Sequence, residues 1–234
     1  MKIRPRTSAG RMIERPRLYL ITPLLDDPAP FIGALEVALS AGDVAAVLAR
    51  LADADERMLI NRAKSIAAVV QRRDIALVLE GRPELAARAD ADGAHLTGIA
   101  AFTAALASLK PDRIAGCGGL RSRHDAMLAG ESGADYVMFG EPTTSANPTR
   151  DHGERRPRFA ALVERVEWWA ELVEVPCVGY AAGRDDVAPL ARAGADFIAL
   201  GDWLWNDAHG PAAAVAAANA ALAAISSTVG RSGL

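Results

Sequence analysis

Short apolar runs alternate with longer segments of helical character along most of the chain. Several of the runs are rich in Val, Ile, Tyr or Phe, which is typical of buried strands. We expect eight strands, at Leu18–Thr22, Val44–Leu48, Ile75–Leu79, Ala94–Leu96, Ile114–Cys117, Tyr136–Phe139, Cys177–Tyr180 and Phe197–Leu200. We expect eight helices after them, at Ala29–Ser40, Arg57–Arg73, Glu84–Ala89, Ala100–Leu109, Arg121–Ser132, Arg158–Val173, Val187–Ala193 and Pro211–Ser226. This alternation predicts an α/β fold.

The connections from helix to strand repeat one local pattern, seen in "ADADGAHL", "ESGADYVMFG" and "RAGADFIALG". Gly133 and Gly194 stand where the end of a helix favours a residue in the left-handed conformation. Asp135 and Asp196 then lead into the next strand. We interpret these aspartates as turn residues rather than as metal ligands.

The number of elements favours a closed barrel. Eight strands and eight helices within about 210 residues fit a (β/α)8 TIM barrel, a fold that needs at least about 200 residues. A doubly wound open sheet is the alternative, but no G-x-G-x-x-G sequence follows the first strand. We expect an N-terminal arm over residues 1–17, a single barrel domain over residues 18–226 and a flexible tail over residues 227–234.

Composition narrows the class of protein. The chain has 234 residues, of which 51% are apolar and 24% charged, as in ordinary soluble globular proteins. Two cysteines do not make a disulfide scaffold, and we expect Cys117 and Cys177 to be small buried side chains. A net charge of −3 gives no basic field for nucleic acid, and no apolar run is long enough to span a membrane. No signal peptide is evident, so we expect a cytoplasmic protein without nucleic-acid or membrane partners.

In a TIM barrel the functional residues lie at the carboxyl ends of the strands. Gly118, Gly119 and Gly183 would let the backbone approach an anionic ligand, and helix N-termini after the seventh and eighth strands would suit a phosphate group. Asp202 opposes this interpretation, because its carboxylate would cap the same N–H groups. We assign substrate or phosphate binding to Thr22, Gly118, Gly119, Thr143, Gly183, Arg184 and Gly201.

Two other features stand out. The polar loop from Glu141 to Pro157 is longer than most connections of its type, and it is either a lid or a surface excursion. Trp168 and Trp169 are adjacent on one predicted helix, so we expect one of them to be exposed or to lie at a contact between subunits. A homodimer is therefore one possible state of the protein.

Five strings occur in order between Leu18 and Trp205: "LYLIT", "ADGAHL", "GADYVMFGEPT", "VPCVGYAAG" and "AGADFIAL". Together they resemble the thiamine phosphate synthase family, which also contains thiazole tautomerases. The resemblance implies a (β/α)8 barrel that acts in thiamine biosynthesis. Its transferases use magnesium to join a pyrimidine, supplied as its pyrophosphate, to a thiazole phosphate. Arg, Lys and the metal stabilise the pyrophosphate as it leaves.

Several family positions hold different residues here. The Gln-Leu-Arg-x-Lys stretch of the second strand corresponds to Val47, Leu48, Ala49 and Leu51, with Arg50, Arg62 and Lys64 nearby. The remaining ionic and phosphate-binding positions correspond to Glu80-Gly81 after the third strand, Ala100 after the fourth, Gly118 after the fifth, Pro148-Thr149-Arg150 near the sixth, Ala181-Ala182-Gly183 after the seventh and Gly201 after the eighth.

From the resemblance we assign catalytic roles to Glu80, His95 and Arg150. Glu80 is also a possible metal ligand, with Glu141 as a second carboxylate, and Mg²⁺ is expected only if the transferase activity is retained. His95 is placed as a general acid or base, and a packed histidine at a strand end is the alternative. The catalytic histidine of the tautomerases corresponds to Leu120, with His124 about one helical turn later.

The sequence therefore predicts a thiamine phosphate synthase-like protein that takes a small-molecule phosphate or a thiazole-type ligand. Two alternatives remain. One is a non-catalytic or repurposed protein that binds a phosphorylated or heterocyclic small molecule. The other is an isomerase of the tautomerase type.

Overall fold

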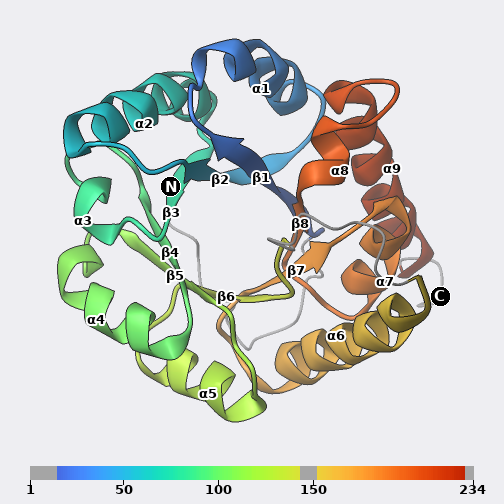
Figure 1. Ribbon diagram of the computed structural model, residues 1–234. Helices are drawn as coiled ribbons and strands as arrows, with labels where there is room; N and C mark the ends of the chain where they lie inside the picture. Colours follow the sequence, from blue (N-terminus) through green and yellow to red (C-terminus); the bar gives the residue numbers. More distant parts are fainter. Residues whose placement is uncertain (1–14, 143–151, 230–234) are drawn as a thin grey trace.

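The computed structural model describes residues 15–142 and 152–229 and shows a closed barrel of eight parallel strands in chain order (Figure 1). Each strand pairs with the next, and the last pairs with the first. This confirms the predicted TIM barrel and excludes the open sheet. The strands are β1 (Arg17–Leu25), β2 (Val44–Leu51), β3 (Ala76–Glu80), β4 (Gly93–Thr97), β5 (Ile114–Gly118), β6 (Tyr136–Phe139), β7 (Cys177–Ala181) and β8 (Phe197–Leu200).

The helices form a ring outside the strands (Figure 1). Short 3₁₀ turns at Ala29–Phe31, Gln71–Arg73 and Arg184–Asp186 adjoin three of them. The helices are α1 (Ile32–Leu39), α2 (Glu56–Val70), α3 (Pro83–Ala86), α4 (Ile99–Leu109), α5 (Arg123–Glu131), α6 (His152–Leu172), α7 (Val187–Arg192), α8 (Asp202–Trp205) and α9 (Pro211–Val229). Within the described ranges, no helix is both long and apolar enough to cross a membrane.

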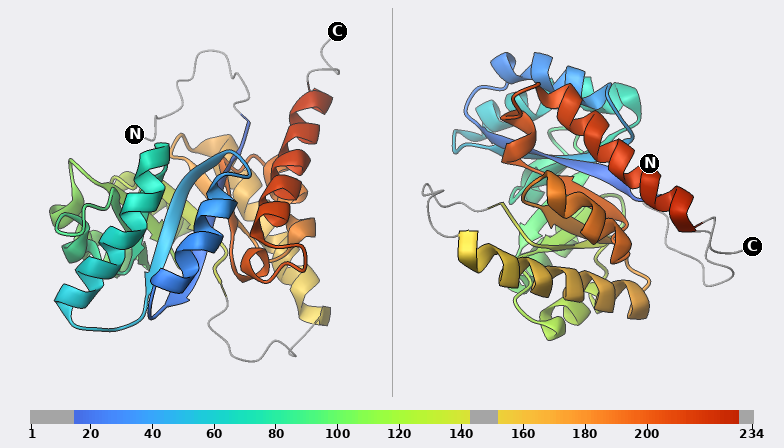
Figure 2. Two further views of the ribbon diagram at one scale, coloured as in Figure 1. Left: turned by 90° about the horizontal axis from the view of Figure 1, so that it is seen from above. Right: turned by 90° about the vertical axis from the view of Figure 1, so that its right-hand side faces the viewer.

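Two helices differ from the prediction. The one-turn helix α8 has no predicted counterpart, and α6 begins at His152, although Pro157 was taken as the end of the preceding loop. Most of the predicted arm and part of the predicted tail lie outside the described residues. The start of β1 and the end of α9 lie at the same end of the barrel (Figure 2, left), where the Arg15 guanidinium donates to the Asn219 carbonyl.

Side chains alternate between the barrel interior and the helix layer, as the period of two in a strand requires. The interior is filled by one apolar cluster: Tyr19, Ile21, Ala46, Leu48, Ala76, Val78, Tyr136, Met138, Val178, Tyr180 and Ala199. The larger cluster between strands and helices holds Cys117 and Cys177, which are buried, as predicted, and form no disulfide.

Strand β5 contributes glycines, rather than side chains, at two interior positions. Gly116 and Gly118 follow Ile114 at inward positions, and they face the Tyr136 ring and the His95 ring. The side chains of Tyr136 and His95 fit inside the barrel because β5 has no side chains at these two positions.

The repeated aspartates stabilise the amino ends of the strands. In three strand pairs the carboxylate of the residue before one strand accepts a backbone N–H of the preceding strand: Asp92 from Leu77, Asp135 from Ala115 and Asp196 from Cys177, at 2.7, 2.7 and 2.9 Å. We refer to these contacts as the aspartate clasps. They explain the repeated sequence pattern structurally and lie far from the mouth.

The tryptophans have distinct places. Trp169 is fully buried and donates from Nε1 to the Val175 carbonyl, whereas Trp168 is half-buried with the Arg123 guanidinium 4.9 Å from its ring centre. In α8, the indole of Trp203 donates to the Ala181 carbonyl in β7 and that of Trp205 to the Ile21 carbonyl in β1. This short helix therefore ties the strands on either side of β8 together.

Candidate functional site

An ion pair lies at the carboxyl ends of β2 and β3. Arg50 Nε donates to Glu80 Oε2 at 3.1 Å, and both residues occupy the inward-facing register of their strands. The Arg50 side chain is mostly buried, with 13% of its surface exposed, and that of Glu80 retains 34%. Glu80 is also the register partner of His95 on β4. The structure thus brings Glu80 and His95, two predicted catalytic residues, to one side of the barrel mouth.

Thr22 stabilises the backbone beside this ion pair. Its hydroxyl is fully buried, donates to the Pro23 carbonyl and accepts the backbone N–H of Arg50 at 3.0 Å. The predicted ligand-binding residue therefore links β1 to β2 just where Arg50 turns toward the mouth.

A chain of hydrogen bonds runs through the barrel interior below the mouth. His95 Nδ1 lies 3.0 Å from Tyr136 Oη, which lies 2.8 Å from Tyr19 Oη. The His95 and Tyr136 rings stack with 13° between their planes. All three residues are almost completely buried. Neither tyrosine is among the predicted site residues, although both stand at inward positions at or next to predicted strand starts.

Gly118 and Gly119 form a close approach on the other side of His95. A Cβ on Gly118 would lie 2.6 Å from His95 Nε2 and 3.3 Å from Glu141 Oε1. Gly119 adopts a left-handed φ of 66°, and its backbone N–H donates to the Glu141 carboxylate. These two predicted glycines therefore leave the space in which an imidazole nitrogen and a carboxylate come together.

Burial controls the protonation of the site. It lowers the pKa of His95 to about 4, so the imidazole is neutral at pH 7. Burial, followed by the negative charge of Glu80, raises the pKa of Glu141. Burial and nearby carboxylates raise the pKa of the Cys117 thiol to about 12, which removes it as a nucleophile.

The opposite side of the mouth carries the other predicted phosphate-binding residues. Gly183 precedes a 3₁₀ turn rather than a long helix, and the Arg184 guanidinium pairs with the Asp207 carboxylate at 2.7 Å. A Cβ on Gly201 would lie 2.8 Å from Tyr180 Oη. This side therefore offers short helical turns and a paired arginine, away from the His95 cluster.

The remaining predicted residues have separate locations. Thr143 and Arg150 lie outside the described residues, so their roles remain predictions. Leu120 is buried, and His124 lies exposed on α5, as its spacing predicts. Across the described ranges, no three His, Cys, Asp or Glu side chains are grouped to hold a metal ion.

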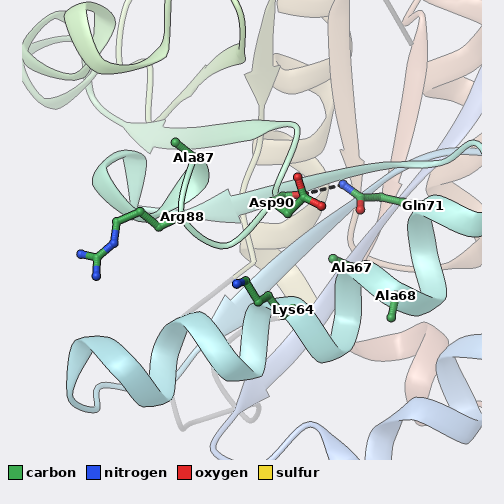
Figure 3. Close-up of a pocket in the computed structure, with 7 residues that line it drawn as sticks. All are labelled: Lys64, Ala67, Ala68, Gln71, Ala87, Arg88 and Asp90. Atoms are coloured by element: carbon green, nitrogen blue, oxygen red, sulfur yellow. Dashed lines mark hydrogen bonds between the residues drawn. The ribbon is translucent and has the colours of Figure 1, made fainter.

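A surface groove of about 490 Å³ lies between α2 and the segment that follows α3, outside the barrel (Figure 3). Its floor includes Ala67, Ala68 and Ala87, and Gln71 reaches across it to donate to the Asp90 carbonyl. The groove lies near the amino ends of β3 and β4, where Gln71 also donates to the Asp92 carboxylate, and brings together none of the predicted site residues.

A sequence profile and two similar relatives all carry the description thiamine monophosphate synthase or thiamine-phosphate synthase. The sequence profile of a family described as thiamine monophosphate synthase matches residues 18–203. The chain is 44% identical over 202 residues to a thiamine-phosphate synthase of Rhodospirillum centenum, covering 86% of this chain and 94% of the relative. It is 39% identical over 223 residues to a thiamine-phosphate synthase of Hyphomonas neptunium, covering 92% and 97%.

Solved structures share the architecture. A thiamine phosphate pyrophosphorylase from Pyrococcus furiosus superposes with a TM-score of 0.69 at 22% identity, over 90% of this chain and 97% of that one. A 3-hexulose-6-phosphate synthase superposes with a TM-score of 0.63 at 17% identity, over 87% and 99%. At these identities the likeness concerns the barrel fold alone.

Proposed function

The chain belongs to the thiamine monophosphate synthase family, and from this premise we propose that the barrel mouth transfers a pyrimidine-methyl group from its pyrophosphate to thiazole phosphate. The observation that carries the proposal is the ion pair of Arg50 with Glu80, which lies beside His95 on the neighbouring strand, while His95 Nε2 faces Gly118. Heterocyclic substrates are oriented by a few fixed polar groups. This end of the barrel supplies such groups above the apolar interior cluster.

Arg50 is the described cation best placed to meet a phosphate group. Glu80 holds its Nε, and the planar guanidinium keeps further N–H groups that can donate to phosphate oxygens. Because the ion pair is fixed before a ligand arrives, these donors are already oriented. We propose that Arg150, which lies outside the described residues, also takes part in catalysis.

Magnesium fits this site through Glu80 and Glu141. Burial raises the pKa of Glu141 and the nearby charge of Glu80 raises it further, so a cation held by these two carboxylates would offset both effects. Mg²⁺ commonly takes one or two carboxylates together with phosphate oxygens and water. When bound, the ion would neutralise charge on the departing pyrophosphate.

A repurposed binding protein is the second candidate, and one observation favours it. Arg184 is a predicted phosphate-binding residue, and Arg50 adjoins the positions that correspond to the family's cationic stretch. Both arginines are paired with carboxylates. A ligand with two phosphate groups gains less from such a mouth than from free cations. In this case the protein would bind a phosphorylated or heterocyclic molecule without turnover. A tautomerase activity would have to use His95 or Glu80, since Leu120 holds the usual histidine position.

The transferase proposal is tested by supplying purified protein with the pyrimidine pyrophosphate, thiazole phosphate and Mg²⁺ and measuring thiamine phosphate. We expect product in wild type and a loss of at least tenfold in kcat/KM for Arg50→Ala. Arg17→Ala, at the amino end of the barrel, should keep wild-type turnover. No product under conditions where a related synthase is active would reject the proposal, and calorimetry with each substrate would then test binding alone.

We also propose that the protein acts in the cytoplasm on these small molecules, without nucleic acid or membrane. This follows from the soluble phosphates that a thiamine phosphate synthase consumes. A homodimer is part of the proposal, with half-buried Trp168 as the side chain to examine. Analytical ultracentrifugation of wild type and Trp168→Ala decides whether two chains associate there.

A further inference from the structure

We propose that Tyr136 is a positioning residue that holds His95 in the tautomer with its proton on Nε2. In this state the barrel mouth presents a neutral N–H donor. The inference concerns the site of the proposed function and rests on the buried contacts among Tyr19, Tyr136 and His95.

The direction of the hydrogen bonds follows from counting donors. Each tyrosine hydroxyl has one proton to donate, and a neutral imidazole has one N–H. If Tyr19 donates to Tyr136 and Tyr136 donates to His95 Nδ1, both hydroxyl protons have acceptors, and the one donor left over is the imidazole N–H, which faces Gly118 at the mouth. Nδ1 then carries no proton, and the imidazole proton must be on Nε2.

The reverse direction leaves a buried donor without a partner. If His95 Nδ1 donated to Tyr136 and Tyr136 to Tyr19, the hydroxyl proton of Tyr19 would need a further acceptor. Within the described ranges, the Tyr19 hydroxyl forms a hydrogen bond with Tyr136 and with no other group, and Tyr19 is 2% exposed. An unsatisfied buried donor is costly, so the first direction is favoured.

The geometry around Nε2 shows what such a donor would meet. Nε2 points to the space above Gly118, where Glu141 Oε1 also lies. The nearby charges of Glu80 and Glu141 disfavour an anionic group at this point. The structure therefore fits an uncharged acceptor, such as a ring nitrogen of a heterocycle, better than a phosphate oxygen. In this role His95 orients the ligand as a neutral donor rather than acting as a general acid.

Nitrogen NMR of the full chain tests the tautomer directly. The protein has four histidines, so ¹⁵N-histidine labelling gives a small set of ring signals, and His95→Gln identifies those of His95. At pH 7.5 and without substrate, we expect Nε2 of His95 at the protonated nitrogen position and Nδ1 at the unprotonated one. The measurement needs no turnover, so it is independent of whether the transferase proposal holds.

Two matched variants separate positioning from packing. Tyr136→Phe removes the donor to Nδ1, so we expect the clear Nε2–H pattern to be lost and the two nitrogens to move toward averaged positions. Tyr19→Phe removes a hydroxyl from the same core but leaves Tyr136 able to donate, so the wild-type pattern should persist.

Three results would overturn the proposal: an Nδ1–H pattern in wild type, a charged imidazole at pH 7.5, or a wild-type pattern in Tyr136→Phe. If Tyr136→Phe does not fold, the wild-type and Tyr19→Phe spectra still decide the direction of the chain.

Discussion

Gly116 lies against the ring of Tyr136 so closely that a Cβ at this glycine would be 2.2 Å from Cζ of the tyrosine. Real Cβ atoms do not approach other atoms at that distance, and the ring is enclosed by the other interior side chains. The absence of a side chain at position 116 is therefore a condition for Tyr136 to reach His95.

Gly116→Ala is expected to lower the free energy of unfolding by about 3 kcal/mol, or to prevent folding, because overpacked cores force neighbouring side chains or backbone to move. Urea denaturation measures the change. Gly33→Ala is the control, since a Cβ in α1 would meet no atom within 4 Å. It should be neutral or stabilising by up to about 1 kcal/mol. Equal effects at both positions would contradict the interpretation.

The stability of the protein should depend on pH through His95. Its pKa is about 4 in the folded protein and 6.5 in an ordinary environment, so the unfolded chain binds the proton first as pH falls. Stability contributed by neutral His95 is thus complete above pH 6.5 and is lost as pH drops toward 4. The loss is about 3 kcal/mol. Denaturation of His95→Gln between these pH values should show a shallower slope, whereas exposed His124→Gln should keep the wild-type slope.

Removing the carboxylate partner of Arg50 should make the mouth bind phosphate groups better. Glu80→Gln leaves the guanidinium without its ion pair, and we expect inorganic pyrophosphate to bind about fivefold more tightly in the absence of metal. Calorimetry at two salt concentrations measures the effect, which salt should weaken. Asp43→Asn, which frees Arg17 at the amino end of the barrel, is the control and should not change binding. Unchanged affinity in Glu80→Gln would show that Arg50 does not face the anion.

The hydrogen bond from α8 to β1 should contribute to stability. Trp205→Phe keeps an aromatic ring against Phe31, whose centre lies 4.6 Å from that of Trp205, but leaves the Ile21 carbonyl without its indole donor. We expect a loss of about 1–2 kcal/mol in the free energy of unfolding. Trp168→Phe, in which the half-buried ring contacts Arg123, should cost less. A larger loss in Trp168→Phe would argue against the α8 contact.

Much of the barrel was predictable, because each strand is a short β-rich run followed by a helix with clear boundaries. The aspartates at positions 135 and 196 were predictable as turn residues from the repeated pattern. Their bonds to Ala115 and Cys177 in the preceding strands were not, because these partners are distant in sequence. By contrast, α8 has only four residues, too few for a helical pattern of apolar and polar positions to be recognised in the sequence. The predicted start of α6, at Arg158, is wrong because Pro157 lies inside the helix rather than at its boundary.

The polar chain inside the barrel was harder to predict. Tyr19, His95 and Tyr136 come from three strands that are far apart in sequence and meet only when the barrel closes. The alternation of side chains along each strand shows from the sequence that these residues point inward. The register between strands, which brings their atoms into contact, cannot be deduced in this way. The pairing of Arg50 with Glu80 has the same origin.

The three aspartate clasps group six of the eight strands into modules of two. Each clasp joins β3 to β4, β5 to β6 or β7 to β8, and none of the three crosses from one module to the next. A circular permutant that opens the chain between β4 and β5 keeps every clasp within a continuous segment. One that opens it between β5 and β6 makes the Asp135 clasp depend on reassembly of the two chain ends. The first permutant should therefore refold more readily than the second, although the two have the same sequence content.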